Sequence, residues 1–356
     1  MNVEERFNLI SQVGEEIITE DDLRTLLEEK KHPVAYDGME PSGNLHIAQG
    51  LLRAINIQKM LKAGCHFKLW IADWFAWMNN KFGGDLDKIR TAGHYMLEVW
   101  KACGLETEGI EILWAKDVMS DDSYWKKVVD IARHSTVSRV KRCTQIMGRE
   151  SSDSMQASFI FYPCMQCADI FHLEADIAQL GMDQRKVNML AREMGPKLGF
   201  WKPVAVHHHM LMGLQKPPTE GEGIDRKIAL KMSKSKPETA IFMTDTDEDV
   251  KRKLGNAYCP AKVAEENPVL EYCRFIVFEK YKEMEIKRPE KFGGDLRIAT
   301  YDELERLFVD GKLHPMDLKN ATAIYVNELL EPVRNHFSKG KAAELLQLVK
   351  SFEVTR

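Results

Sequence analysis

The stretch that decides the fold covers residues 32–46 and reads HPVAYDGMEPSGNLH. Its apolar start reads as a short strand that runs into Tyr36-Asp37-Gly38, and a loop follows at residues 39–44. Residues 45–61 have the spacing of a helix, and residues 67–72 read as a second buried strand. A strand, a glycine-bearing loop, a helix and a strand make the unit of a parallel doubly wound sheet, so we predict an α/β fold.

The pattern on both sides extends this unit. Residues 1–30 read as two helices, and residues 85–150 are rich in helix with one strand near residues 111–114. Strands follow at residues 177–180 and 204–207, separated by a helical stretch, and a polar loop is expected at residues 215–227. We therefore predict N-terminal helices at 1–30, a Rossmann-type domain at 31–240 with a helical insertion at about 85–150, and an all-helical C-terminal domain at 241–356.

Composition excludes several classes of protein. The chain has 356 residues, 44% hydrophobic and 29% charged, which is enough apolar mass for a sizeable core and argues against disorder. The formal net charge of −4 excludes a generally basic nucleic-acid coat, although a local basic patch remains compatible. No apolar run has the length of a membrane span, and the N-terminus lacks the order of a signal peptide. Seven cysteines in so long a chain favour reduced thiols and a cytoplasmic location.

The first chemical motif is the loop and helix start at residues 41–50. Ser42 and Gly43 allow a ligand to approach the backbone closely, and free amides at a helix start favour phosphate. His46 lies in the first turn, where its imidazole could donate to a phosphate oxygen. The alternative is a capped helix that carries a surface histidine.

The second motif is Lys231-Met232-Ser233-Lys234-Ser235, which follows the polar loop. Two lysines around small hydroxyl residues suit a loop that folds over a polyphosphate and neutralises its charge. The alternative is a solvated basic loop. Together the two motifs resemble the signatures of class I aminoacyl-tRNA synthetases, with His46 to Gln49 standing where that class has His-Ile-Gly-His. Here Ala48 and Gln49 replace the glycine and the second histidine.

The third motif lies on a helix over residues 156–173. Tyr162, Gln166 and Asp169 are spaced i, i+4 and i+7, so they share one face. A polar face among phenylalanines suits a pocket for a small ligand with an ammonium and a polar tip, whereas the alternative is a partly exposed helix. With Tyr36 and residues 181–186, the pattern resembles tyrosyl-tRNA synthetases of the archaeal and eukaryotic cytosolic type, over about residues 33–336.

The resemblance implies a role for each matching residue. Those expected to contact tyrosine are Tyr36 and Asp169 at the phenol, and Tyr162, Gln166 and Gln184 at the ammonium and carboxylate. Those expected at ATP are Gly38, Glu40, Gly43, His46, Gly181, Asp183, Lys231, Ser233 and Lys234, of which His46, Lys231 and Lys234 are catalytic. Those expected at tRNA are Arg142, Arg185, Lys186 and Met189 at the acceptor end, and Phe292, His314 and Asp317 at the first anticodon base.

The resemblance also implies the reaction and its partners. ATP and tyrosine give tyrosyl-adenylate and pyrophosphate, and the tyrosyl group then moves to the 3′ end of tRNA. Mg²⁺ is expected with ATP, and no tightly bound protein metal is expected. A homodimer is implied, with the insertion at about 85–150 as the interface, and the C-terminal domain would bind the anticodon.

Three rival functions remain open at this point. A tryptophan–tRNA ligase shares the fold and signatures, but an indole has no hydroxyl for Tyr36 and Asp169. A catalytically inactive relative that acts as an RNA-binding or signalling module is disfavoured by the retained His46, Lys231 and Lys234. Another class I-like nucleotidylyltransferase is disfavoured by the anticodon-like residues of the C-terminal part.

Other features have simpler interpretations. Cys164 and Cys167 form a CxxC without a second pair, so we expect buried thiols rather than a zinc site. Neighbours in the histidine run at residues 207–209 would point to opposite faces of a strand, which favours structural roles over one metal ion. Lys-Phe-Gly-Gly-Asp-Leu occurs at residues 81–86 and again at 291–296, and we treat it as a recurring loop.

Overall fold

The computed structural model describes residues 1–105, 108–144, 156–218 and 223–352. Its centre is a six-stranded sheet in the order β1-β6-β5-β2-β3-β4. The strands are β1 (Gly14–Ile18), β2 (Val34–Met39), β3 (His66–Ile71), β4 (Ile110–Trp114), β5 (Ile177–Gly181) and β6 (Val204–His208). All neighbouring pairs are parallel except β1 and β6. The predicted doubly wound α/β fold is confirmed.

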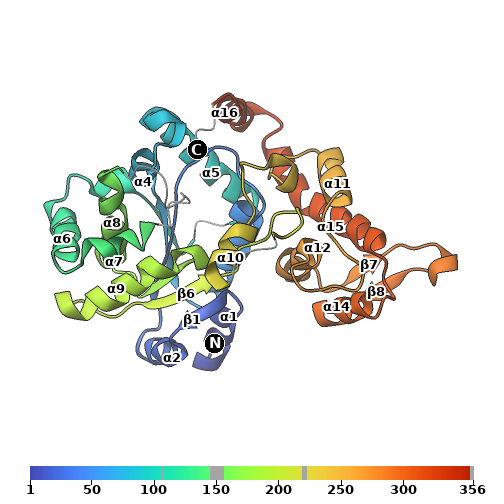
Figure 1. Ribbon diagram of the computed structural model, residues 1–356, viewed down its shortest axis with the longest axis horizontal. Coiled ribbons are helices and arrows are strands. Elements are labelled where there is room, and N and C mark those ends of the chain that lie inside the picture. The colour runs from blue at the N-terminus through green and yellow to red at the C-terminus, as the bar shows by residue number, and fades with distance from the viewer. Residues whose placement is uncertain (106–107, 145–155, 219–222, 353–356) are drawn as a thin grey trace.

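Helices cover both faces of the sheet, and alternate strand residues feed two cores (Figure 1). On one face lie α1 (Val3–Ser11), α3 (Arg53–Lys62) and α5 (Leu86–Ala102). On the other lie α4 (Asp73–Met78), α6 (Asp122–Arg133), α7 (Val137–Lys141), α8 (Ser158–His172) and α9 (Arg185–Leu198). Ala35 and Leu69 point into the first core, whereas Tyr36 and Trp70 point into the second, as the two-residue period of a strand requires.

The N-terminal region contains the two expected helices and one strand that was not expected. α1 begins with a capping box of Asn2 and Glu5, and Thr19 caps α2 (Glu20–Glu29). Between them, β1 pairs antiparallel with β6 at the sheet edge. Residues 1–30 are therefore not purely helical. The sequence Gly-Glu-Glu-Ile-Ile has no apolar alternation, and ion pairs of Glu15 and Glu16 with histidines near the end of β6 help to hold this strand.

The predicted insertion at about 85–150 also needs a correction. β4 pairs with β3 along five residues, and α5 is the crossover helix between them. β4 is therefore the edge strand of the main sheet, and α5 belongs to the connection that leads to it, so neither element is part of an insertion. Beyond β4, the helices α6 and α7 pack against α8. Residues 145–155 of the predicted segment lie outside the described residues.

The C-terminal part is helical apart from one small hairpin. Its helices are α11 (Asp247–Gly255), α12 (Pro268–Tyr272), α13 (Phe278–Lys280), α14 (Tyr301–Val309), α15 (Pro315–His336) and α16 (Gly340–Lys350). β7 (Met284–Ile286) and β8 (Leu296–Ile298) pair antiparallel, so the all-helical expectation is wrong here. Strands of three residues are too short to show a period in sequence. Part of the expected loop at 215–227 is also helical, since α10 spans Gly223–Leu230.

Shorter turns complete the chain. The helix expected over residues 45–61 begins as a π-helical turn, η1 (Ala48–Leu52), before α3, and a second π-helical turn, η7 (Cys273–Val277), joins α12 to α13. Among the described residues, 3₁₀ turns include η2 (Lys81–Gly84), η3 (Ala115–Val118), η5 (Met182–Gln184), η6 (Pro237–Thr239) and η8 (Glu290–Phe292). Within the described residues, no helix is both long and apolar enough to cross a membrane.

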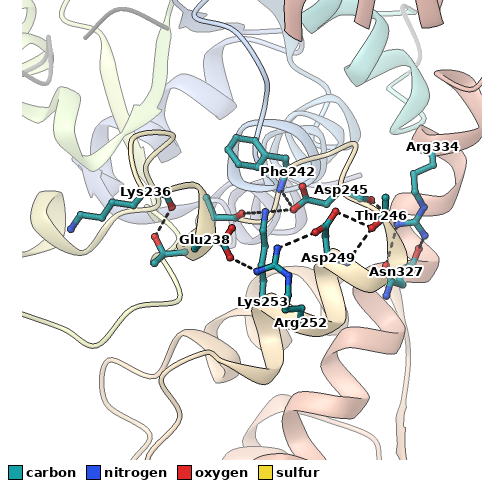
Figure 2. A network of polar contacts seen from close by, with 12 residues as sticks. Lys236, Glu238, Phe242, Asp245, Thr246, Asp249, Arg252, Lys253, Asn327 and Arg334 are labelled. Carbon is teal, nitrogen blue, oxygen red and sulfur yellow. Dashed lines mark hydrogen bonds and ion pairs between the residues drawn. The ribbon is translucent and has the colours of Figure 1, made fainter. Parts of the chain in front are cut away.

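The segment between the lysine motif and α11 is fixed by a polar network (Figure 2). Lys253 of α11 is buried and donates to the Ala240 carbonyl at 2.9 Å and to Asp245 Oδ2 at 2.6 Å. From α15, Arg334 donates to the Asp245 carbonyl at 3.3 Å and to Asn327 Oδ1 at 3.1 Å. Two helices of the C-terminal part therefore hold residues 240–245 in place.

Candidate active site

The candidate site lies where the order of the sheet reverses. β2 and β5 are neighbours, and the chain leaves them toward opposite edges, to β3 and to β6. Ligands of open α/β sheets bind at such a switch point, beside the carboxyl ends of the strands. Tyr36 and Gly38 lie in β2, Gly181 ends β5, and Asp183 and Gln184 lie in the turn η5 that follows.

One end of the site is closed by buried hydroxyl and carboxyl groups. Tyr36 and Asp169 are each 1% exposed. Burial raises the pKa of Asp169 well above its usual range. Burial and then the charge of Asp169 raise the pKa of Tyr36, so its hydroxyl stays protonated. This end can therefore offer both a donor and an acceptor to one polar atom.

A residue that the sequence did not reveal completes this end. The Tyr124 hydroxyl of α6 donates to Asp169 Oδ1 at 2.8 Å. The indole N–H of Trp70 faces the same carboxylate but does not reach hydrogen-bond geometry. Tyr124 lies 45 positions before Asp169, on a different helix. No spacing rule connects the two residues, so only the packing of α6 on α8 reveals the contact.

Earlier in α8, Tyr162 and Gln166 are also buried, which contradicts the alternative of a partly exposed helix. The Tyr162 hydroxyl donates to the Glu40 carboxylate, which also accepts from Asn79. Gln166 Nε2 donates to Gln184 Oε1 at 2.9 Å. These contacts bring α8, the loop after β2 and the turn after β5 together.

The lysine motif lies across the switch point. Lys231 Nζ contacts Asp183 Oδ2 at 2.8 Å, and Lys234 Nζ donates to Ser42 Oγ at 3.0 Å. Partial burial, followed by the charge of Lys81, lowers the pKa of Lys234 to about 7. Ser233 shares a hydrogen bond with Ser235 at 2.9 Å. Both lysines therefore reach the site, and the alternative of a purely solvated loop does not hold for them.

Two glycines of the site are required by geometry. Gly43 has a φ of 90°, a conformation that L side chains rarely adopt. A Cβ on Gly181 would lie 2.6 Å from Asp183 Oδ1, too close for any side chain without a shift. The backbone can thus turn sharply after β2 and pass directly beneath the Asp183 carboxylate.

His46 is 7% exposed, so the alternative of a surface histidine is wrong. Two backbone hydrogen bonds hold its segment: Ile47 N donates to the Ile241 carbonyl at 2.9 Å, and Met243 N donates to the Leu45 carbonyl at 2.8 Å. Burial, then the charges of Lys234 and Lys231, lower the pKa of His46 well below its usual value. Its Nδ1 is buried without a hydrogen-bond partner in the described part of the chain. The imidazole is therefore neutral and able to bond a ligand.

The residues expected at the tRNA acceptor end are brought together on one side of the molecule. Arg142 is exposed directly after α7, and the others lie in the first turns of α9. The Cys143 thiol donates to the Lys186 carbonyl at 3.4 Å, which ties the two helices. Arg185 bonds Glu16 of β1 at 2.8 Å, and Met189 is half-buried.

The residues expected at the anticodon lie at the far end of the C-terminal part. Phe292 is 61% exposed in the loop between β7 and β8. Arg288 donates to the Gly294 and Lys312 carbonyls, both at 2.8 Å, and so holds this loop beside the start of α15. His314 caps α15 by accepting from Met316 N, and Asp317 lies in the first turn. The N-cap of α15 is therefore His314 and not Asp317.

Comparisons with known proteins identify the family. Residues 28–331 match the family model described as tRNA synthetases class I (W and Y). Tyrosine–tRNA ligase 1, cytoplasmic, from Arabidopsis thaliana is 47% identical, over 99% of this chain and 90% of that protein. Tyrosine–tRNA ligase from Saccharolobus islandicus is 44% identical over 100% of both. The chain belongs to the tyrosyl-tRNA synthetases.

A solved structure agrees with this assignment. The tyrosyl-tRNA synthetase from Pyrococcus horikoshii, solved in complex with L-tyrosine, has a TM-score of 0.92 at 40% identity and covers 99% of this chain and 100% of that one. The enzyme is a tyrosine–tRNA ligase that uses ATP, tyrosine and tRNA as substrates. This assignment excludes the three rival hypotheses, namely a tryptophan–tRNA ligase, a catalytically inactive relative and another class I-like nucleotidylyltransferase.

The remaining motifs of the synthetase have structural partners of their own. His207 bonds Glu16 at 2.8 Å, His208 bonds Gln179 at 2.6 Å, and His209 bonds Glu15 at 3.1 Å. Each histidine thus has a separate partner, as their alternation along the strand predicts. Cys164 and Cys167 are buried thiols, and burial raises the pKa of Cys164 to about 11. All seven cysteines of this chain are free.

Proposed function

We propose that Tyr36 and Asp169 select tyrosine by its phenol hydroxyl. That hydroxyl would accept from the Tyr36 hydroxyl and donate to the Asp169 carboxylate. Phenylalanine has no such group and would leave both buried side chains unpaired, which is costly in free energy. The observation that carries the proposal is the burial of this donor and acceptor, each 1% exposed, at the closed end of the site.

Tyr162, Gln166 and Gln184 would then hold the ammonium and carboxylate of tyrosine. The linked amides of Gln166 and Gln184 and the pair of Tyr162 with Glu40 offer several acceptors to an ammonium. In this arrangement the substrate carboxylate would lie toward the switch point. The carboxylate is already a nucleophile, so the residues around it need only position it and exclude water.

ATP would bind across the switch point. Its phosphates would lie against the loop of Gly43, and its ribose would face Asp183. The residues proposed for this site are Gly38, Glu40, Gly43, His46, Gly181, Asp183, Lys231, Ser233 and Lys234. Mg²⁺ would enter as part of the ATP substrate.

In the first step, a carboxylate oxygen of tyrosine attacks the α-phosphorus, and the bond to the bridging oxygen of pyrophosphate breaks. His46, Lys231 and Lys234 would stabilise negative charge as it develops on the phosphates. In the second step, a terminal ribose hydroxyl of tRNA attacks the tyrosyl carbonyl, and AMP leaves. No side chain needs to form a covalent bond in either step.

The larger partners are proposed on surface features. Arg142, Arg185, Lys186 and Met189 would contact the tRNA acceptor end, and Phe292, His314 and Asp317 the first anticodon base. The homodimer would use the segment of about residues 85–150, where Ile112, Val129 and Val137 are exposed apolar side chains. A cytoplasmic location is proposed from the free cysteines and from the Arabidopsis relative, which is named as cytoplasmic.

ATP–pyrophosphate exchange, measured with each amino acid separately, tests the proposed selectivity. We expect strong exchange with tyrosine and at most weak exchange with phenylalanine or tryptophan. Stronger exchange with tryptophan than with tyrosine would refute the roles of Tyr36 and Asp169.

A further inference from the structure

The hydroxyl of Tyr124 forms a hydrogen bond with the Asp169 carboxylate. It donates to Oδ1 at 2.8 Å, whereas its other acceptor, the Met165 carbonyl, lies at 3.4 Å. The shorter distance is typical of a well-formed O–H···O hydrogen bond, and the longer one is marginal for an O–H donor. A buried tyrosine could satisfy its hydroxyl with a backbone carbonyl alone, but this one is directed at the carboxylate.

Packing leaves the Tyr124 ring little freedom to turn away. The side chain is fully buried. Its ring packs edge-on against His172 of α8, with centroids 5.3 Å apart, and against Trp125, with centroids 5.7 Å apart. α6 itself lies along α8, the helix that carries Asp169. The direction of the hydrogen bond is therefore fixed by the core of the second face of the sheet.

Asp169 has no cation to stabilise its charge in the described part of the chain. The groups around it are Tyr36 of β2, Trp70 of β3, Tyr124 of α6, and Cys167 and Tyr162 of its own helix, all of them neutral donors. Burial opposes ionisation, and the hydrogen bond from Tyr124 favours it. A carboxylate without a cationic partner depends on such donors to remain an acceptor.

We propose that Tyr124 is a positioning and specificity-determining residue: its hydroxyl occupies Asp169 Oδ1, orients the carboxylate and keeps it an acceptor, so that Oδ2 is presented to the phenol of tyrosine. Tyr124 does not touch the substrate in this proposal; it acts through Asp169. The inference rests on the proposed role of Asp169 at the phenol. It adds a residue of α6 to the groups that select tyrosine, although none of the sequence motifs lies on that helix.

The test is Tyr124→Phe, which removes one oxygen and keeps the ring. In ATP–pyrophosphate exchange, kcat/KM for tyrosine should fall by about 10- to 100-fold, since a hydrogen bond to a charged group is lost. The value for phenylalanine should stay nearly unchanged, so selectivity falls by the same factor. Without this donor the pKa of Asp169 rises, so the loss of activity on the acid side should begin at a higher pH than in the unaltered enzyme.

Tyr272→Phe is the matched control. Tyr272 is fully buried, and its hydroxyl donates to the Met212 carbonyl at 3.1 Å, in the other core. Its loss should lower the melting temperature but change neither selectivity nor the pH profile. If Tyr124→Phe behaves like this control, Tyr124 is only structural and the inference is wrong.

Asp169→Asn separates this inference from the proposed function. If Asp169→Asn keeps full selectivity for tyrosine, the proposed role of Asp169 fails and the inference fails with it. If Asp169→Asn abolishes selectivity but Tyr124→Phe does not, only the inference fails. In the Asp169→Asn background, Tyr124→Phe should have little further effect on selectivity; full additivity of the two effects would contradict the coupling. The melting temperature of every variant is measured in parallel.

Discussion

Two copies of one hexapeptide place their phenylalanines in opposite environments. Phe82, in the copy at residues 81–86, is 7% exposed and packs edge-on against Phe352, with ring centroids 5.5 Å apart. Phe292, in the copy at 291–296, is 61% exposed. Side chains of the same type in the same local sequence are thus buried or presented according to what the rest of the fold brings to them. The exposure of Phe292 is not explained by packing, which favours a role in binding.

At the scale of single residues, Asp169 gives the sharpest prediction. Asp169→Ala should lower kcat/KM for tyrosine in pyrophosphate exchange by roughly 100-fold or more, about 3 kcal/mol, because the phenol loses a charged acceptor. Asp176→Ala is the control, since Asp176 is also buried but bonds Lys30 and Val34 N outside the site. It should reduce stability without changing selectivity. A near-normal kcat/KM in Asp169→Ala would exclude Asp169 from the tyrosine pocket.

Lys234 gives a prediction about pH. Its pKa of about 7 means that the free enzyme loses the lysine charge as pH rises through neutrality. Since the cation is the form that stabilises phosphate charge, kcat/KM for ATP should fall as pH rises through about 7. Bound phosphates favour the cation, so the corresponding loss in kcat should appear at a higher pH.

The substitution Lys234→Ala tests the same role. Single-turnover adenylate formation should slow by about 10²- to 10³-fold, while the Kd for tyrosine stays unchanged, because the contact matters most in the transition state. The exposed neighbour Lys236 serves as control, and Lys236→Ala should have a small effect. Weaker tyrosine binding with unchanged adenylate formation would show that Lys234 acts elsewhere.

At the scale of elements, sequence predicted those that bury an apolar pattern. β2, β3, β5 and β6 were predicted because their buried residues run together in the sequence, and α8 was predicted as an aromatic-rich helix that carries a polar face. β1 was not predicted, because its two glutamates pair with histidines that lie far away in the sequence. In the same way, the contact of Tyr124 was not predicted, because its partner Asp169 lies on another helix. Contacts between side chains far apart in the chain leave no local signal.

The network around α11 supports a prediction for the segment after the lysine motif (Figure 2). Lys253→Met would leave the partly buried Asp245 carboxylate without its cation and should lower the free energy of unfolding by about 2–3 kcal/mol. Adenylate formation should slow as well, since residues 241 and 243 bond the backbone on both sides of His46. The measurements are urea denaturation and single-turnover kinetics.

Lys251→Met is the matched control on the same helix. Lys251 pairs with Asp247 on the surface, so its loss should change stability by about 0.5 kcal/mol or less. Similar losses of stability in both variants would show that α11 depends on its surface charge in general and not on the contacts of Lys253 with Asp245 and the Ala240 carbonyl.

At the scale of the whole molecule, the regions proposed to bind tyrosine and the anticodon lie apart. The switch point of the sheet and the β7–β8 hairpin lie in different parts of the structure, and α11 and α15 lie between them (Figure 1). Phe292 and the start of α15 are held together by Arg288, far along the chain from the lysine motif. Recognition of tRNA and activation of tyrosine should therefore be separable by mutation.

Asp317 provides that separation. A carboxylate repels a phosphate backbone, but it accepts well from the N–H edge of an unstacked guanine, and proteins read RNA by sequence mainly in single-stranded loops. The exposed ring of Phe292 could supply a stacking surface, worth about 1–3 kcal/mol per base. His314 already caps α15, so the Asp317 side chain is not needed as the cap.

Asp317→Ala should therefore impair charging of tRNA with G at the first anticodon position and leave pyrophosphate exchange intact. The same variant should lose little further activity on a tRNA changed at that base, because the contact is already absent there. Asp302→Ala, an exposed aspartate in the first turn of α14, is the control and should charge both tRNAs normally. Equal loss on both tRNAs, or loss of exchange as well, would indicate that Asp317 stabilises the start of α15 and does not read the base.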